Sequence, residues 1–329
     1  MSELHKFIFD GMPVRGAIVR LTDAWTEVLR RRASNTTTGP YPVPVAELLG
    51  EMAAAGALMQ SIIKFNGALV LQIMGDGPVK LAVAEVQSDF ALRATASVVG
   101  PVEEGARLSA MVNRHNQGRC AITLDPKTKF PGQQPYQGVV PLYGDHGQKI
   151  EHLSEVLEHY MLQSEQLDTT LVLAADANIA AGILIQRMPV EGEANLEGEQ
   201  ARAAREAGIG ADEDYNRIMH LTRSMTREEL LTLDVDTILR RLFWEEKLLR
   251  FAPQDGEGRP HFACTCSRER VSRMIRGLGA EEAESIIAER GDIEVACEFC
   301  GQQYRFDAID AAQVFTDKLE LPPGSAKVQ

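Results

Sequence analysis

Long apolar runs, dense basic blocks and abundant cysteine are all missing from this chain of 329 residues, and each shortage excludes a class of protein. The longest weakly polar stretch, residues 52–63, is well short of the roughly 20 apolar residues that a membrane-spanning helix needs. The N-terminal residues contain no apolar core followed by a small-residue cleavage site, so we expect no export signal. The sequence therefore predicts a soluble globular protein without a membrane partner.

Positive charge is also in short supply. The formal net charge is -13 at pH 7, and the only compact basic run is Arg30–Arg32. Such a chain repels a phosphate backbone unless a strong local basic patch compensates, so we expect no nucleic-acid partner. The glycine-rich phosphate-binding loop of nucleotide hydrolases is missing as well, which indicates a function without ATP.

Cysteine is rare and unevenly placed. The chain has five cysteines, an odd number that does not suit a secreted disulfide framework. Cys120 stands alone, and its default interpretation is a buried, inert thiol. The other four lie together in the last quarter of the chain. Clustered cysteines in a chain without an export signal indicate metal binding in a reducing compartment, and we expect the cytoplasm.

The four clustered residues form two close pairs, Cys264 with Cys266 and Cys297 with Cys300. Two thiolate pairs supply a complete tetrahedral shell for one Zn²⁺ and leave no open position, so hydrolytic catalysis is not expected there. The first pair is the less common one, because ligand pairs usually have two to four intervening residues. His261 lies nearby and is a weaker alternative ligand, since four cysteines already complete the shell.

Local patterns around the second pair predict a knuckle between two strands. Residues 280–290 have a helical pattern that Gly291 terminates, residues 293–296 alternate as a strand into the pair, and residues 304–306 alternate out of it. A module of about 60 residues has a thin core, and metal binding contributes about 10–16 kcal/mol to such a fold. Oxidation of the ligands would therefore unfold it, and each pair is close enough in sequence for its own disulfide. The site is either a structural staple or a redox sensor.

The rest of the chain mixes strands and helices. Residues 69–74 and 80–86 predict a hairpin around the turn Gly75–Pro78, and residues 44–63 and 150–163 have helical spacing. Strand and helix do not alternate regularly, so a parallel sheet is not expected. The fold class is α+β, with an N-terminal mixed α/β domain, a helical linker and a small C-terminal zinc-binding domain.

Composition changes after Met188. Residues 191–214 are rich in Glu, Gly and Ala and are interpreted as a linker. Thr226 and Glu229 form a capping box that starts a helix or helix pair running to about Arg250. Apolar residues follow at helical spacing, and we name this set the linker stripe: Leu231, Val235, Ile238, Leu242, Phe243 and Trp244. The stripe is either a helix face packed on a core or a surface with a removable cover.

Taken together, these segments resemble the family of 33-kDa heat-shock proteins, which are redox-regulated holdase chaperones. The resemblance rests on HFACTCSRERV and VACEFCGQQYRF around the two cysteine pairs. VRGAIVRL, KFNGALVLQIMGDGP, YQGVVPL, YMLQSEQLDT and AAGILIQRMP look like family segments in family order. Residues 191–214 are longer and more charged than the expected linker, and nothing after Leu321 matches.

The resemblance implies an N-terminal chaperone core at 1–188, a metastable linker at 189–254, a redox-switch zinc domain at 255–319 and a tail at 320–329. It implies that the reduced protein holds zinc and is inactive. Oxidation with mild unfolding stress then forms the disulfides Cys264–Cys266 and Cys297–Cys300, releases zinc and exposes a surface, for which the linker stripe is the candidate, to unfolding client proteins. The family is described as dimeric when active and independent of ATP.

Two other functions remain open from the residues alone. A constitutive interaction protein with a purely structural zinc site would have the same cysteine pattern. An enzyme is not expected, because His115, His146, His152 and His159 have no metal-binding or nucleophile motif around them.

Overall fold

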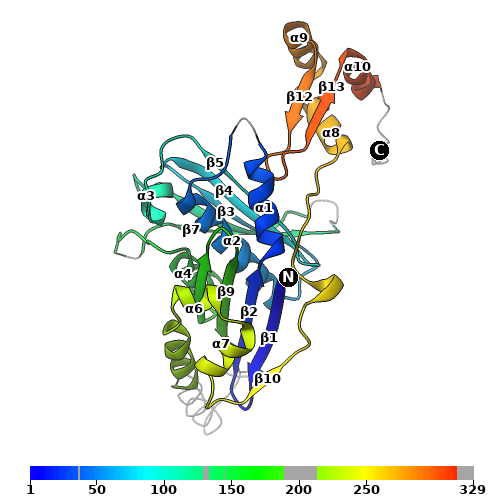
Figure 1. Cartoon of the computed structure of the whole chain (residues 1–329). Coiled ribbons are helices and arrows are strands. Elements are labelled where there is room, and N and C mark those ends of the chain that lie inside the picture. Colours follow the sequence, from blue (N-terminus) through cyan, green and yellow to red (C-terminus); the bar gives the residue numbers. More distant parts are fainter. Residues whose placement is uncertain (36–37, 129–132, 145, 189–212, 317–329) are drawn as a thin grey trace, which may run out of the picture. The chain divides into compact units, whose positions relative to one another are not determined.

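The computed structural model describes residues 1–35, 38–128, 133–144, 146–188 and 213–316 (Figure 1). The chain divides into two compact units, Met1–Ala263 and Cys264–Gln329. The first contains two sheets and the second a single two-stranded sheet. This arrangement confirms the predicted α+β class with a small C-terminal four-cysteine part. The predicted boundaries of the linker, at 188/189 and 254/255, stay a prediction. They separate segments that are expected to unfold from segments that are expected to stay folded.

Two sheets, antiparallel but for one short parallel pair at an edge of the second, form the body of the first unit. The strands of the first sheet are, in spatial order, β10 (Leu248–Arg250), β1 (Glu3–Phe9), β2 (Val14–Leu21), β9 (Ala180–Arg187) and β8 (Thr169–Ala175). Those of the second are β11 (His261–Phe262), β5 (Ala91–Val98), β4 (Val79–Gln87), β3 (Gly67–Met74), β6 (Arg119–Pro126) and β7 (Tyr136–Pro141). The predicted hairpin is confirmed, since Leu71 of β3 faces Ala84 of β4.

A single long helix, α2 (Val43–Ile62), packs against strands of both sheets. It is buried over most of its length, and the small residues Ala53–Ala57 let both sheets approach its backbone closely. Being buried on all sides, it is apolar all round, as expected for a central helix. None of the helices in the described ranges is both long and apolar enough to cross a membrane. Shorter helices surround this core: α1 (Asp23–Ala33), α3 (Leu108–Val112) and α4 (Leu153–Glu165).

The first sheet is buried on both faces, by different covers. Successive side chains of a strand point to opposite faces, so Ala17 and Val19 of β2 join the core around α2 while Ile18 joins a second cluster. This second cluster is covered by a helical layer of residues 213–223, α6 (Arg227–Thr232) and α7 (Val235–Leu242). The layer, the later part of the predicted linker, thus packs on the first unit.

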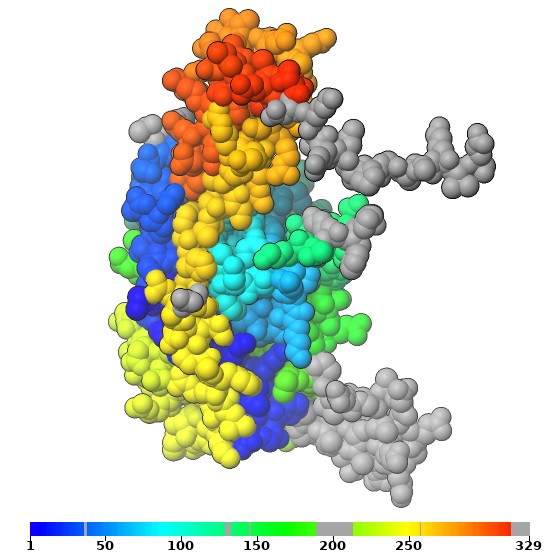
Figure 2. Space-filling view, turned by 90° about the vertical axis from the view of Figure 1, so that its right-hand side faces the viewer, coloured from blue at the N-terminus to red at the C-terminus, as the bar shows by residue number. Residues whose placement is uncertain are grey.

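The predicted helix does not reach Arg250. It is a helix pair that ends at Leu242, and Leu248–Arg250 form strand β10 because they complete the exposed edge of β1, with Phe7 opposite Arg250. The chain then crosses the surface of the first unit from the strands of the first sheet to those of the second, coloured yellow in Figure 2. It ends in β11, which pairs with β5 directly before Cys264.

The second unit contains the predicted helix and the two predicted strands around the second cysteine pair, together with two helices that the sequence analysis did not predict. Its elements are α8 (Arg268–Leu278), α9 (Ala280–Arg290), β12 (Ile293–Ala296), β13 (Gln303–Phe306) and α10 (Ala308–Thr316). Gly291 ends α9 at a φ of 87°, a left-handed conformation that glycine adopts without a steric penalty. Residues 189–212 of the expected linker and the expected tail lie outside the described residues.

Candidate metal centre

The second cysteine pair lies on a tight turn between β12 and β13. Ala296 faces Gln303 across the hairpin, so residues 297–302 form the turn. The Cys297 N–H donates to the Gln302 carbonyl at 2.9 Å, and the Gly301 N–H donates to the Cys297 carbonyl at 2.7 Å. Gly301 has a φ of 72°, where a side chain would be strained. The turn thus brings the sulfurs of Cys297 and Cys300 toward one point.

The first pair lies in the short segment between β11 and α8. Ser267 caps α8, because its side chain accepts from the Arg270 N–H at 3.3 Å. The Arg270 side chain in turn donates a hydrogen bond, 2.7 Å long, to the hydroxyl of Thr265, the residue between the two cysteines. These contacts bend the segment, which is how a pair with a single intervening residue can present both sulfurs to one ion.

All four sulfur atoms lie within 4.8 Å of one another. The Cys264 and Cys297 sulfurs are 3.6 Å apart, and those of Cys266 and Cys300 are 3.4 Å apart. A tetrahedral zinc with Zn–S bonds of about 2.3 Å requires sulfurs about 3.8 Å apart. The geometry therefore fits a four-thiolate site with no open position, and within the described ranges no other group of metal-ligating side chains is brought together. His261 is not part of this group, which consists of the four cysteines, and its Nδ1 contacts the Arg259 carbonyl.

The electrostatics of the cluster allow all four thiols to lose their protons only beside a cation. The hydrogen bond with Cys264, followed by burial, raises the pKa of Cys297, and burial raises the pKa of Cys300 to about 11. Backbone N–H groups oppose this effect, because those of Cys300 and Phe299 lower the pKa of Cys297. Four adjacent thiols cannot all lose their protons alone, whereas a divalent cation deprotonates coordinating thiols outright. The oriented N–H groups then help to hold the resulting negative charge.

Tyr304 is a contact that the sequence analysis missed. Its hydroxyl donates to the Cys266 sulfur at 3.1 Å, which links β13 to the other cysteine pair. The alternating strand pattern after Gly301 predicted strand β13, but it did not predict that Tyr304 points toward the sulfurs. A hydrogen bond to a ligand sulfur withdraws electron density from it, so Tyr304 is an outer-shell partner of the centre.

The apolar core around this centre is small. It has seven buried members: Val271, Ile275, Ala283, Ile293, Phe306, Ala311 and Val314. Arg268 covers it, with its guanidinium 4.1 Å from the Phe306 ring centroid and 2.8 Å from the Asp310 carboxylate. The fold of this unit therefore depends on the sulfur cluster as well as on apolar burial.

The linker stripe is packed on the first unit. Val235, Ile238, Leu242 and Phe243 are buried, Leu231 is half-buried, and only Trp244 is exposed, at 75%. The Phe243 ring packs edge-on against Phe9 with the centroids 5.0 Å apart. In this conformation the stripe is a helix face on a core, and only Trp244 is presented to solvent.

Two arginines fasten the helical layer to the rest of the first unit, and the sequence analysis missed both. Arg20 of β2 donates to the carbonyls of Leu230 and Leu231 at 2.7 and 3.1 Å. Arg227 donates to the Glu47 carboxylate at 2.6 Å and to the Ala175 carbonyl. The predicted capping box is present at Thr226. The layer is thus held by a small number of polar contacts in addition to its apolar face.

The remaining candidate residues form no second site. The four histidines considered as enzyme residues belong to no metal-ligating group within the described part of the chain. Cys120 is fully buried on β6, and burial raises the pKa of its thiol to about 12, so it stays protonated and unreactive.

Comparison with known proteins gives one consistent result. The family model described as Hsp33 protein matches residues 2–307. The 33 kDa chaperonin of Chromobacterium violaceum is 42% identical, with 95% of this chain and 94% of the relative covered. That of Methylobacillus flagellatus is 40% identical, covering 98% and 97%. The crystal structure of the Thermotoga maritima Hsp33 homologue has a TM-score of 0.70 at 21% identity, covering 95% of this chain and 97% of that one, and supports the fold. This chain therefore belongs to the Hsp33 family, a family of chaperones and not of enzymes.

Proposed function

We propose that this chain is a redox-regulated holdase that binds unfolding proteins without ATP. In the reduced state Cys264, Cys266, Cys297 and Cys300 hold one Zn²⁺, and the client surface is covered. The observation that carries this proposal is the set of four sulfurs within 4.8 Å in a unit whose own apolar core is small. Loss of the thiolates would remove the main support of that unit.

The oxidation step involves only these side chains and a peroxide-class oxidant. Each disulfide, Cys264–Cys266 and Cys297–Cys300, forms in two steps: one thiolate attacks the oxidant and becomes a sulfenic acid, and the second thiolate then attacks the sulfenic sulfur and displaces hydroxide, which leaves as water. Each disulfide gives up two electrons, and one peroxide accepts them and becomes water with the protons supplied by solvent. Oxidised sulfurs no longer bind zinc as thiolates, and thiol reductants reverse the reaction.

Unfolding of the second unit would reach the linker along the chain. Cys264 is separated from β11 by Ala263 alone, and the Ala263 N–H donates to the Leu92 carbonyl of β5 at 3.1 Å. If this short strand detaches, the segment back to β10 loses one of its anchors. Release of the helical layer would then expose the linker stripe together with Phe7, Phe9 and Ile18 of the first sheet, which form the same apolar cluster. We propose this combined surface as the client site.

Aggregation of a thermally unfolding client, followed by light scattering without ATP, tests the proposal. We expect the reduced, zinc-loaded protein to be inactive and the protein treated with peroxide at mildly raised temperature to suppress aggregation, with zinc release in parallel. The variant Cys120→Ala is the matched control, since it removes a thiol outside the centre and should respond like the wild type. Equal suppression in both states would instead indicate a constitutive interaction protein with a structural zinc site.

The proposed redox switch also leads to expectations about the oligomeric state of the protein and its cellular compartment. We propose that exposure of the apolar cluster allows two activated chains to associate, because an apolar surface of this kind is unstable in water. Sedimentation of the oxidised and the reduced protein would measure this directly. A reducing cytoplasm would keep the thiolates available for zinc until oxidative stress occurs.

A further inference from the structure

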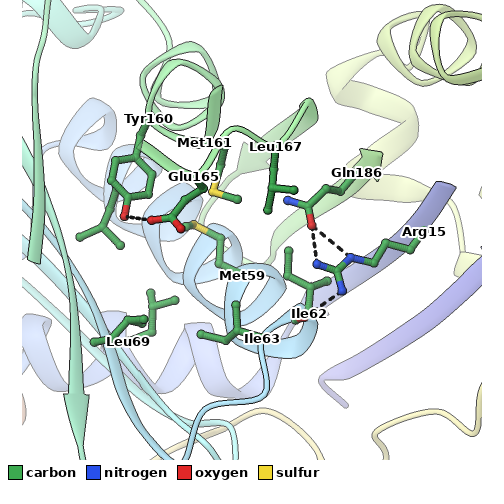
Figure 3. Close-up of a pocket in the computed structure, with 12 residues that line it drawn as sticks. Arg15, Met59, Ile62, Ile63, Leu69, Tyr160, Met161, Glu165, Leu167 and Gln186 are labelled. Carbon is green, nitrogen blue, oxygen red and sulfur yellow. Dashed lines mark hydrogen bonds between the residues drawn. The ribbon is translucent and has the colours of Figure 1, made fainter. Parts of the chain in front are cut away.

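A half-buried arginine in the first unit, Arg15, has no acidic partner in the part of the chain that the structure describes. Arg15 of β2 donates from Nε and Nη2 to the Gln186 side-chain carbonyl and from Nη1 to the Ile62 carbonyl at 3.1 Å (Figure 3). These acceptors are neutral, and no carboxylate among the described residues pairs with Arg15. A guanidinium has five N–H groups, so one remains on each of its two terminal nitrogens. Two N–H groups on adjacent nitrogens match the geometry of one carboxylate.

An apolar pocket of about 90 Å³ lies beside this guanidinium. The apolar side chains that line it come from the second sheet, from α2 and α4 and from the loop after α4, and they include Met59, Leu69, Ile122, Leu124, Met161 and Leu167. Figure 3 shows Arg15 at one end of the pocket and Glu165 at the other. The Tyr160 and Tyr136 hydroxyls both donate to the Glu165 carboxylate, at 2.8 and 3.1 Å. The Glu165 carboxylate repels any anionic group of a ligand, so this end of the pocket suits the uncharged end of a ligand.

A second pocket, of about 360 Å³, shares Arg15, Ile62 and Ile63 with the first. Lys6 and Lys64 also line it, and no acidic side chain does. Neither lysine forms an ion pair with a described residue. Three cations that have no acidic partner among the described residues are therefore gathered here, in a chain whose net charge is -13. Their joint field favours one anionic group at the junction of the two pockets.

We propose that these two pockets form a binding site for a small amphipathic carboxylate, with the carboxylate on Arg15 and an aliphatic body in the apolar pocket. The second pocket, with Lys6 and Lys64, is the entry side. Ligand sites of this kind are mostly apolar with a few placed polar groups. The site uses no cysteine and no part of the linker stripe. It goes beyond the proposed chaperone function and does not depend on it.

Calorimetric titration of the reduced, zinc-loaded full chain with decanoate tests the site, with decanol as the uncharged probe. We expect saturable binding of one decanoate per chain, and binding of decanol at least about tenfold weaker because a charge-assisted bidentate contact is lost. No saturable binding of decanoate would overturn the proposal. Equal affinity for both probes would also overturn it, because that would mean simple apolar partition.

Two variants separate the contribution of the Arg15 charge to decanoate binding from that of the space in the pockets. Arg15→Met removes the guanidinium, and Ile63→Trp fills the junction without changing charge; each should weaken decanoate binding at least about tenfold. Arg119→Met is the matched control, since Arg119 is half-buried and lies on β6, whose Ile122 and Leu124 line the first pocket, while its own side chain lines neither pocket. It should bind decanoate like the wild type. Wild-type affinity in both Arg15→Met and Ile63→Trp, with normal thermal unfolding, would sink the assignment.

The chain's own acidic stretch is the alternative occupant that the test must exclude. Met188 lines the second pocket, and the acidic residues that begin at Glu191 follow it directly in sequence. We expect a variant lacking residues 190–212 to bind decanoate as the full chain does. Binding seen only in the shortened variant would overturn the proposal, because the site would then belong to that segment.

Discussion

The two compact units differ in what stabilises them. The first buries a continuous apolar core around α2, and its strands and helices pack on one another across two sheets. The second has seven buried apolar side chains and a cluster of four sulfurs. Burial cannot be undone by an oxidant, whereas thiolate coordination can. The difference shows how one part of a chain can sense oxidants while the other remains folded.

A similar contrast exists inside the first unit. The core around α2 lies between the two sheets, whereas the cluster on the other face of the first sheet is covered, among the described residues, by the helical layer. That layer is fastened by contacts such as those of Arg20 and Arg227. We therefore expect the cover to be the part of the first unit that is released at the lowest free-energy cost.

The largest expected effect comes from removing the metal ligands. Cys297→Ser with Cys300→Ser should unfold the second unit, because metal binding contributes on the order of 10 kcal/mol to such a module. Hydrogen exchange should show loss of protection in α8 to α10 and unchanged protection in β3 and β4. A chelator applied to the wild type should reproduce this pattern. Persistent zinc binding by the double variant would refute the ligand assignment.

Removal of one buried phenylalanine ring should affect the folding of the two units differently. Phe306→Ala and Phe7→Ala both remove a buried ring, at a cost of about 3–5 kcal/mol. We expect Phe306→Ala to leave the second unit unfolded at low zinc and to weaken zinc binding, because its core has little else. Phe7→Ala should lower the thermal stability of the first unit without unfolding it. Competition with a zinc-binding dye and thermal unfolding measure the two effects.

Loosening the helical layer should sharpen the contrast within the first unit. Arg20→Met removes two hydrogen bonds from a charged donor to the Leu230 and Leu231 carbonyls, worth about 1–3 kcal/mol. We expect partial suppression of client aggregation by the reduced protein, with zinc still bound. Arg114→Met, in an exposed loop, is the control and should leave the reduced protein inactive. If Arg20→Met is also inactive when reduced, the layer is not the cover of the client surface.

The sequence predicted the grouping of the four cysteines better than the packing of the linker stripe. Cysteine spacing, the Gly291 cap and the alternation around Cys297 are local signals, and each corresponds to local backbone structure. The packing of the linker stripe depends on long-range contacts, because Phe243 packs against Phe9, which is more than two hundred residues away in the sequence. The same reason explains the error at residues 248–250, where pairing with β1 overrides a local helical pattern.

A pH effect should distinguish the first unit from the second. Burial raises the pKa of Glu51 to about 8, with Arg227 opposing and Glu47 adding to the shift. Because the folded state binds this proton more tightly than the unfolded state, the stabilisation is full below pH 4.5 and is lost as pH rises to about 8. We expect Glu51→Gln to flatten the pH dependence of unfolding of the first unit by on the order of 1 kcal/mol. Identical slopes for variant and wild type would contradict this assignment.

The smallest expected effect concerns Tyr304, and it tests whether the centre is tuned as a sensor. Its hydroxyl donates to the Cys266 sulfur, so it withdraws charge from a thiolate that would otherwise attack oxidants faster. Tyr304→Phe keeps the ring and removes this bond, and zinc release under limiting peroxide should become about threefold to tenfold faster. Tyr136→Phe, whose hydroxyl binds Glu165, is the matched control and should release zinc at the wild-type rate. Unchanged release from Tyr304→Phe would mean that the hydroxyl only positions β13, and that oxidant access alone sets the rate.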